Sequence, residues 1–280
     1  MFWLFKKKKK DVACSTHKEE ACFDDRVAKE ILESIRAEFG LDYSKQEQIT
    51  MRKIERFARK NEMMNFETLQ QALKESAQIK EQLVNMLTVG ETYFYRETGH
   101  FKILADLMQR QSMKKILCAP SSSGEEAYSI ILYLLENQKD SLPVNVVGID
   151  VNSDSIAAAQ EAIYSERSTS LLPPSMRENY FHKVNERYKL NENVKQNATF
   201  LRQNIFDDSL FNLGKFDVIF CRNMLIYFDD KEKKEVLKRL HKMLNPKGVL
   251  FLGHADIAFT PEGFEKKFTK NGNYFLVLNL

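Results

Sequence analysis

Apolar residues recur at helical spacing in the first third of the chain. Val27, Ile31, Ile35 and Phe39 stand four positions apart, and Gly40 follows them as a helix stop signal. Further amphipathic stretches follow, and no strand-like alternation interrupts them. Their apolar faces are marked by Ile54–Ala58, Phe66–Leu73 and Ile79–Leu87. The pattern predicts an all-helical N-terminal domain over residues 24–88.

Beyond this domain the pattern changes to short apolar runs that alternate with amphipathic helices. The runs, which have the length of buried strands, occupy residues 116–119, 144–149, 216–221 and 248–253. Strands that alternate with helices favour a largely parallel sheet with helices on both faces. We therefore expect residues 101–280 to form an α/β domain, joined to the helical domain by a linker over residues 89–100.

Two stretches depart from the simple alternation of strands and helices. Residues 181–201 are polar, with short alternating pieces at 188–190 and 198–201, and they indicate a small β-subdomain inserted in the α/β domain. Near the end of the chain, two strand-like runs flank Asn271-Gly272, a strong indication of a β-hairpin. We expect this hairpin to extend the parallel sheet with antiparallel strands.

The charge balance of the chain argues only against nucleic-acid binding. The net charge of the 280 residues is +3, and the run Lys6–Lys10 more than accounts for it, so the body of the chain has no electrostatic footprint for nucleic acid. Residues 1–23 are interpreted as a disordered basic tail. The alternative is a weak interfacial membrane anchor, because aromatic residues precede the lysines. The apolar run Phe2–Phe5 is too short for a membrane span or a signal peptide.

The cysteines predict neither a metal site nor a disulfide framework. Cys14, Cys22, Cys118 and Cys221 lie far apart, without a CxxC pair or a histidine at ligand spacing. Cys118 and Cys221 fall inside apolar runs, where a cysteine is usually a small buried hydrophobe. A reducing, cytoplasmic location fits this usage best.

Candidate chemistry begins at the turn after the first strand of the α/β domain. A dinucleotide fingerprint needs three glycines there, whereas this turn has Gly124 followed by Glu125 and Glu126. Two carboxylates would repel a diphosphate but tolerate the ammonium and sulfonium of S-adenosylmethionine. An ordinary helix N-cap with acidic first-turn residues is the alternative reading.

Asp150 ends the second strand, where a carboxylate can accept hydrogen bonds from both hydroxyls of a ribose. Alone, it could equally cap the helix that begins near Ser153. Together with the acidic turn, it favours a nucleoside site. The expected terminal hairpin is typical of S-adenosylmethionine-dependent methyltransferases and is missing from the dehydrogenase-type sheet.

At this point the sequence resembles a known family. Four segments, in the same order as in that family, resemble the chemotaxis receptor glutamate methyltransferases of CheR type: Leu87–Glu97, Ser122–Ser129, Phe216–Phe228 and Leu252–Asp256. The resemblance spans about residues 25–280. Two positions depart from the family pattern: Gly90 stands where many members have Asn, and Asp256 stands where Glu is usual.

The resemblance implies the fold class and the roles of individual residues. The fold is α/β: a Rossmann-like S-adenosylmethionine-dependent methyltransferase sheet with a terminal antiparallel hairpin, a small inserted β-subdomain and an N-terminal all-helical domain. S-adenosylmethionine is the implied cofactor and S-adenosylhomocysteine its product. Arg96 and Tyr227 are the implied catalytic residues. The implied cofactor-binding residues are Thr92, Arg96, Gly124, Glu126, Asp150, Asn204, Ile205, Arg222 and Asn223.

The implied acceptor is a glutamate γ-carboxylate on the helical cytoplasmic region of a methyl-accepting receptor. A carboxylate is already ionised at neutral pH and needs no general base, so Arg96 and Tyr227 would act as positioners. His254 is interpreted as a structural residue. The expected state is a monomer that meets the membrane through its receptor or weakly through its basic tail, with a receptor tether peptide docking at the β-subdomain. The alternatives are a methyltransferase of the same fold with another acceptor, or a non-catalytic cofactor-binding module.

Overall fold

The computed structural model describes residues 23–88, 90–110, 112–137, 144–256, 260–269 and 274–278. Residues 1–22 of the basic tail, which include Cys14 and Cys22, and the Asn271-Gly272 turn lie outside the described residues. Within the part of the chain that is described, no helix is both long enough and apolar enough to cross a membrane.

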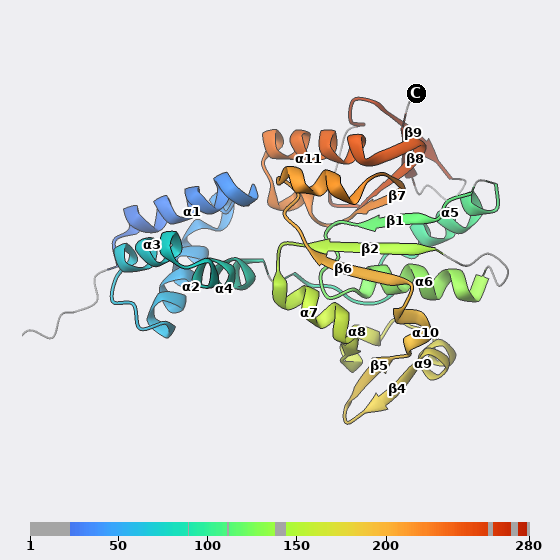
Figure 1. Cartoon of the computed structure of the whole chain (residues 1–280), viewed down its shortest axis with the longest axis horizontal. Coiled ribbons are helices and arrows are strands. Elements are labelled where there is room, and N and C mark those ends of the chain that lie inside the picture. Colours follow the sequence, from blue (N-terminus) through green and yellow to red (C-terminus); the bar gives the residue numbers. More distant parts are fainter. Residues whose placement is uncertain are drawn as a thin grey trace, which may run out of the picture.

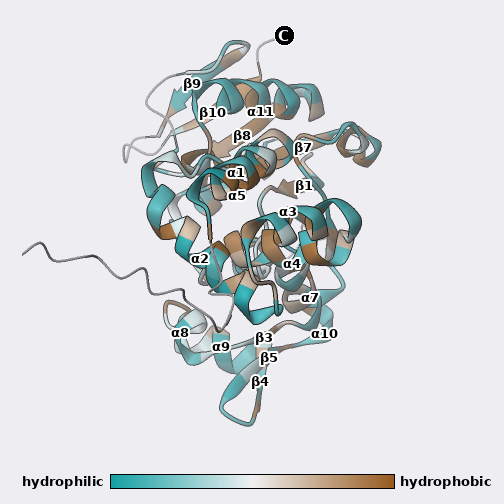
Figure 2. Ribbon diagram, turned by 90° about the vertical axis from the view of Figure 1, so that its left-hand side faces the viewer, coloured by the Kyte–Doolittle hydropathy of each residue, from teal (hydrophilic) through white to brown (hydrophobic). Residues whose placement is uncertain are grey.

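The N-terminal domain is all-helical, as the apolar spacing predicts (Figure 1). Figure 2 shows hydrophilic and hydrophobic residues sharing each helix, and the hydrophobic faces meet in a core that includes Ile31, Ile54, Leu69 and Leu83. Its helices are α1 (Asp25–Phe39), η1 (Ser44–Gln46), α2 (Glu47–Lys60), α3 (Phe66–Glu75) and α4 (Ala77–Leu87). Side chains of Asp24, Asn65 and Ser76 accept hydrogen bonds from the first turns of α1, α3 and α4, and so fix where these helices begin.

The second domain is built on a seven-stranded sheet in the order β6-β2-β1-β7-β8-β10-β9. The first five strands in that order pair in parallel, and the terminal hairpin of β9 and β10 adds two antiparallel strands, which confirms the expected fold class. The strands are β1 (Lys115–Cys118), β2 (Asn145–Asp150), β6 (Ala198–Arg202), β7 (Phe216–Cys221), β8 (Leu244–Leu252), β9 (Phe264–Phe268) and β10 (Tyr274–Leu278).

Helices cover both faces of this sheet. On one face α5 (Gly99–Met108), α6 (Glu125–Asn137) and α7 (Ser153–Glu161) share a core with alternate residues of the strands. On the other face α11 (Asp230–Met243), beside the short helices η2 (Asp208–Leu213) and η3 (Leu225–Tyr227), packs on a core that runs on into the helical domain. β1 lies between β2 and β7, so the order of strands reverses there. The carboxyl ends of these strands therefore form the expected ligand crevice.

The inserted subdomain differs from its predicted extent. Its antiparallel sheet has the order β3-β5-β4, so it begins earlier than residue 181. Residues 198–201, which the sequence pattern assigned to the insertion, instead belong to β6, an edge strand parallel to β2. The wrong assignment has a physical reason. Of the five β6 residues only Phe200 is buried, so this edge strand has little of the apolar character that marks the buried strands of a parallel sheet. The subdomain contains β3 (Ile163–Tyr164), α8 (Glu166–Thr169), α9 (Pro174–Tyr180), β4 (Phe181–Val184), β5 (Arg187–Leu190) and α10 (Glu192–Lys195).

Specific contacts join the helical domain to the sheet domain. Gly40 ends α1 with φ 72°, and a Cβ at this position would lie 2.3 Å from the ring of Phe206, so only glycine permits this approach. Close by, the backbone N–H of Asp42 donates to the carbonyl of Tyr227 over 2.8 Å. Arg36 of α1 forms an ion pair with Asp229 at the N-terminus of α11. The two domains thus meet beside the end of β7.

Candidate active site

A cavity of about 280 Å³ opens at the carboxyl ends of β1, β2 and β7. Its wall is shared: the linker and the sheet domain supply most of it, while Phe39 and Leu41 come from the helical domain. Every residue that the resemblance assigned to the site lines this cavity except Gly124. Those that line it are Thr92, Arg96, Glu126, Asp150, Asn204, Ile205, Arg222, Asn223 and Tyr227.

Gly124 supports the site from behind. It adopts φ 91°, and a Cβ there would lie 3.0 Å from both Ala159 and Phe200, on the side of the packed helices. The glycine therefore lets the turn after β1 close against α7 and β6. A contact between Gly124 and the cofactor does not follow from its position.

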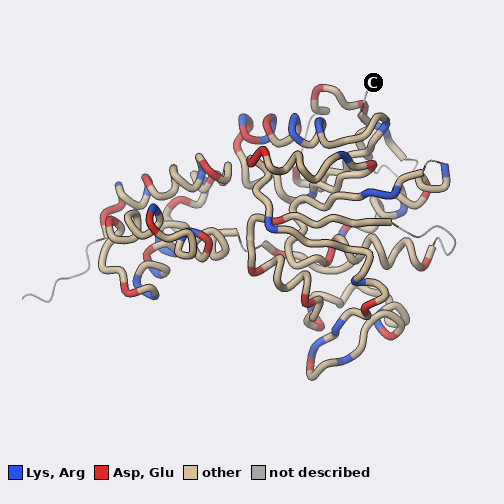
Figure 3. The backbone as a smooth tube through the Cα atoms, in the orientation of Figure 1, with Lys and Arg blue, Asp and Glu red and all other residues tan. Residues whose placement is uncertain are grey.

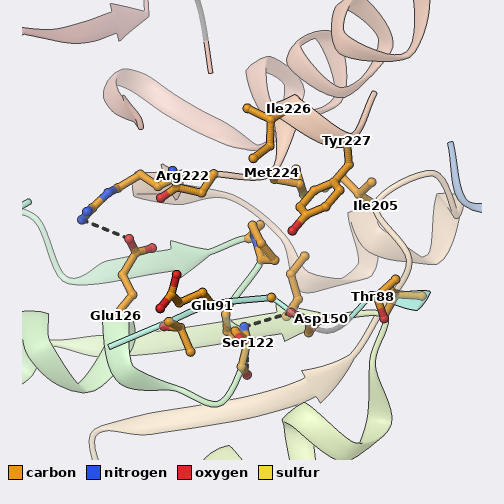
Figure 4. A pocket seen from close by; sticks show the side chains of 18 of the residues that line it. Thr88, Glu91, Ser122, Glu126, Asp150, Ile205, Arg222, Met224, Ile226 and Tyr227 are labelled. Carbon is orange, nitrogen blue, oxygen red and sulfur yellow. Dashed lines mark hydrogen bonds and ion pairs between the residues drawn. The ribbon is translucent and has the colours of Figure 1, made fainter. Parts of the chain in front are cut away.

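Asp150 presents its carboxylate at the floor of the cavity (Figure 4). One carboxylate oxygen accepts a hydrogen bond from the N–H of Ser122 and the other from the N–H of Asn152, both over 2.9 Å. Burial nevertheless raises the pKa of Asp150, and these two hydrogen bonds oppose that shift. Each oxygen keeps a free lone pair, so Asp150 can still accept two hydroxyl donors. The helix cap near Ser153 is supplied by Asn152 instead.

Arg222 organises the other end of the cavity. Its guanidinium, in a side chain only 1% exposed, lies 3.0 Å from a carboxylate oxygen of Glu126 and 3.3 Å from one of Glu97. It also donates to the carbonyl of Arg96 over 2.6 Å. Arg222 thus joins the end of β7, the start of α6 and the linker. Glu97 was not expected from the sequence, although its position next to Arg96 in the linker motif could have suggested it.

Glu126 has the features that a site for an ammonium group requires. Its Oε1 is buried and accepts no hydrogen bond, while Oε2 faces Arg222. Burial raises the pKa of Glu126 to about 7, against the opposing effect of Arg222. An α-ammonium group would supply a donor to Oε1 and a second positive charge beside Glu126 and Glu97, which share Arg222. The residues present therefore fit the methionine end of S-adenosylmethionine here and its ribose at Asp150.

A pH dependence of cofactor affinity follows from Glu126. A bound ammonium favours the ionised carboxylate, so the affinity for S-adenosylhomocysteine should rise with pH up to about 7 and then level off, with up to about a tenfold loss for each pH unit below. Calorimetric titrations over this range should show proton release on binding at the acidic end. Glu126→Gln should bind more weakly and lose this dependence; retention of it in the variant would contradict the assignment.

Tyr227 and Arg96, the two implied catalytic residues, both line the cavity. The Tyr227 ring points into it, with its hydroxyl directed toward the side of Asp150 (Figure 4). Burial raises the pKa of Tyr227, which keeps the hydroxyl protonated at neutral pH. Arg96 donates to the carbonyl of Glu91 over 3.0 Å. Gly90 leaves room beside the tyrosine, because a Cβ there would lie 3.8 Å from its hydroxyl.

Asn204 and Ile205, two of the implied cofactor-binding residues, have different surroundings. Ile205 is buried and presents an apolar side chain to the cavity. The side chain of Asn204 is engaged with its surroundings: its amide group donates to the carbonyl of Glu38 in α1 over 2.8 Å, and its oxygen accepts from the N–H of Phe206 over 3.0 Å. Asn204 thus also joins the two domains.

Two buried side chains near the cavity had no predicted role. Glu125 accepts hydrogen bonds from the hydroxyls of Ser123 (2.7 Å) and Ser168 (2.8 Å), which tie the acidic turn to α8 of the subdomain. His100 is buried, and burial lowers its pKa to about 4. His254 lies 3.0 Å from Glu97 and does not line the cavity.

Among the described residues there is no cluster of side chains that could hold a metal ion.

Comparison with known sequences identifies the family. The family described as CheR methyltransferase, SAM binding domain, matches residues 90–272 of the chain. The chain belongs to this family. It uses S-adenosylmethionine, the cofactor that the fit at Glu126 and Asp150 indicates, and the resemblance seen in the sequence is confirmed.

Similar proteins agree with this assignment. The chain is 34% identical over 251 residues to the chemotaxis protein methyltransferase of Campylobacter jejuni, which covers 88% of this chain and 94% of that protein. It is 34% identical over 206 residues to chemotaxis protein methyltransferase 2 of Vibrio cholerae, covering 69% and 72% of the two chains. A third relative is the probable biofilm formation methyltransferase WspC of Pseudomonas putida, 33% identical over 192 residues, which are 66% of this chain and 45% of that one.

Proposed function

We propose that this CheR-type methyltransferase transfers a methyl group from S-adenosylmethionine to glutamate γ-carboxylates of a chemotaxis-type receptor. The observation that carries the proposal is the set of side chains that lines the cavity. Among the described residues that line the cavity there is no His, Lys or Cys. The carboxylates that line it are held by other groups: Asp150 by backbone amides, Glu126 by Arg222 and Glu91 by Arg167. Such a site suits an acceptor that arrives ionised, as a glutamate does.

The side chains of the cavity then act by position and charge. When bound, S-adenosylmethionine supplies the methyl group on a positively charged sulfur. Arg96 attracts the acceptor carboxylate. The neutral Tyr227 hydroxyl orients the acceptor carboxylate or the transferred methyl group. Phe39 and Leu41 exclude water on one side, which favours a step in which opposite charges neutralise one another.

The surface of the helical domain supports a glutamate-rich partner. The α2 residues Arg52, Lys53, Arg56, Arg59 and Lys60 are all exposed, and basic residues follow this helix in Figure 3. We propose that a receptor helix docks here as the acceptor of a monomeric, cytoplasmic enzyme. A receptor tether peptide would add to an edge of the three-stranded sheet, where β4 has one unpaired side. The name of the Pseudomonas putida relative leaves room for an output other than motility.

The chemical nature of the product tests the proposal. Incubation with radiolabelled cofactor and chemoreceptor-rich membranes should label receptor bands, and mild alkali should release the label as methanol, because carboxyl methyl esters are base-labile. Label that survives alkali would point to N-methylation and would contradict the proposal. Receptor in which the acceptor glutamates are replaced by alanine is the matched control.

Tyr227→Phe tests the division between binding and turnover. Removal of one hydroxyl that acts near the transferred methyl should lower kcat by about 10- to 100-fold. The affinity for S-adenosylhomocysteine should change by no more than about threefold, because the ring remains in place. Single-turnover kinetics and calorimetry measure the two quantities separately. An unchanged kcat would remove Tyr227 from the proposed catalytic pair.

A further inference from the structure

Asp256 is a buried carboxylate that does not line the cavity and accepts hydrogen bonds from backbone amides. It is 5% exposed and follows β8. One of its oxygens accepts from the N–H of Leu225 over 3.0 Å, and the other accepts from the N–H of Gly253 over 3.0 Å and from the N–H of Asn223. Two of these three donors belong to the turn after β7.

That turn carries Tyr227. Asn223 adopts φ 58°, a left-handed conformation that asparagine tolerates better than most residues other than glycine. The chain then enters η3, and the N–H of Tyr227 donates to the carbonyl of Met224 over 3.1 Å. The amides bound by Asp256 are thus those at the unusual residue and at the first residue of η3, so they set the direction in which Tyr227 leaves the turn.

We propose that Asp256 is a positioning residue for methyl transfer, which holds the turn of residues 223–227 so that the Tyr227 hydroxyl faces the middle of the cavity. This inference rests on the proposed function, because it assumes that the Tyr227 hydroxyl acts in turnover. Asp256 itself does not line the cavity.

The local chemistry requires an acidic acceptor. An ionised carboxylate has only acceptor sites, and it can satisfy three N–H donors at once. The amide of an asparagine would place N–H groups against backbone N–H groups and leave at least one buried amide without an acceptor. Gly253 is part of the same arrangement, since a Cβ there would lie 2.6 Å from the Oδ2 of Asp256.

The turn is also held from its other side. The carbonyl of Tyr227 accepts the hydrogen bond from Asp42 of the helical domain. Asp256 holds N–H groups of the turn, and Asp42 holds the carbonyl of Tyr227. The backbone of Tyr227 is therefore fixed from both sides, and mainly its side chain can still rotate. Loss of Asp256 should therefore misdirect the tyrosine while Glu126 and Asp150 remain in place.

A double-mutant cycle in kcat tests the inference. Asp256→Asn and Tyr227→Phe should each lower kcat at saturating cofactor by about tenfold or more. The double variant should be no slower than the slower single variant, within about threefold, because both changes remove the same positioned hydroxyl. Losses that multiply would overturn the inference. An unaffected Tyr227→Phe variant would instead indicate that the proposed role of Tyr227 is wrong.

Two measurements separate positioning from a general loss of structure. Calorimetry should show that Asp256→Asn keeps its affinity for S-adenosylhomocysteine within about fivefold; loss of binding equal to the loss of kcat would contradict a positioning role. If Asp256→Asn does not fold, Gly253→Ala tests the same contact with the charge retained, and it must give the same non-additivity with Tyr227→Phe. Asp230→Asn, at a carboxylate whose side chain is 91% exposed, is the matched control and should be without effect.

Discussion

Asp150→Ala should abolish measurable cofactor binding while the protein stays folded. The substitution removes the proposed acceptor of the ribose hydroxyls and leaves the N–H groups of Ser122 and Asn152 without their carboxylate partner. Loss of hydrogen bonds to a buried charged acceptor, together with the disturbed turn, should weaken binding of S-adenosylhomocysteine by about 100-fold or more, or about 3 kcal/mol.

Calorimetry measures this loss directly. Asp154→Ala is the matched control: it removes an exposed carboxylate two residues after Asn152, and it should leave the affinity unchanged. Binding that survives Asp150→Ala within about threefold would remove Asp150 from the site and would place the ribose elsewhere in the cavity.

Arg222→Met should cause the largest loss of stability. The methionine fills similar space but leaves Glu126 and Glu97 without their shared cation, in side chains only 16% and 18% exposed. Removing one partner of a buried ion pair costs about 3–5 kcal/mol, so the free energy of unfolding at neutral pH should fall by that amount. The melting temperature should fall by about 10 °C.

The pH dependence of that loss has a definite sign. In the variant, the pKa of Glu126 should rise further, since the arginine that lowers it is gone. A folded-state pKa above the unfolded value means that the folded chain binds more protons, so the variant should recover stability as the pH falls from about 7 toward about 5.

Arg239→Met provides the matched control for this experiment. Arg239 also pairs with two carboxylates, those of Asp208 and Glu235, but these are 85% and 49% exposed. Its replacement should cost about 1 kcal/mol or less, without the recovery at low pH. Equal losses in the two variants would show that the Arg222 cluster has no special role in stability.

The sequence predicted those features that depend on local periodicity. Apolar spacing gave the helices and the buried strands, and strand ends located Asp150 and Glu126, because parallel strands deliver their carboxyl ends to one edge. Residues 198–201 were misassigned, since the pattern of β6 does not say which neighbour the strand pairs with.

Contacts between distant segments could not be predicted. The sequence gives no sign that Arg222 binds Glu97, which is far earlier in the chain, or that the carboxylate of Asp256 accepts amides of the turn after β7. Likewise, no sequence pattern indicates that a side chain at Gly124 would meet Ala159 and Phe200. Such relations follow from packing in three dimensions, to which single-sequence patterns are blind.

The hydrogen bond between Asp42 and Tyr227 has a consequence for how this family can diverge. It joins the two domains through backbone atoms alone, so no pair of side chains has to change together to preserve it. The helices of the N-terminal domain can then accumulate substitutions on their surface while the tyrosine keeps its place. Correlated substitutions among relatives would not reveal this junction, and exchanging whole helical domains between members should preserve it.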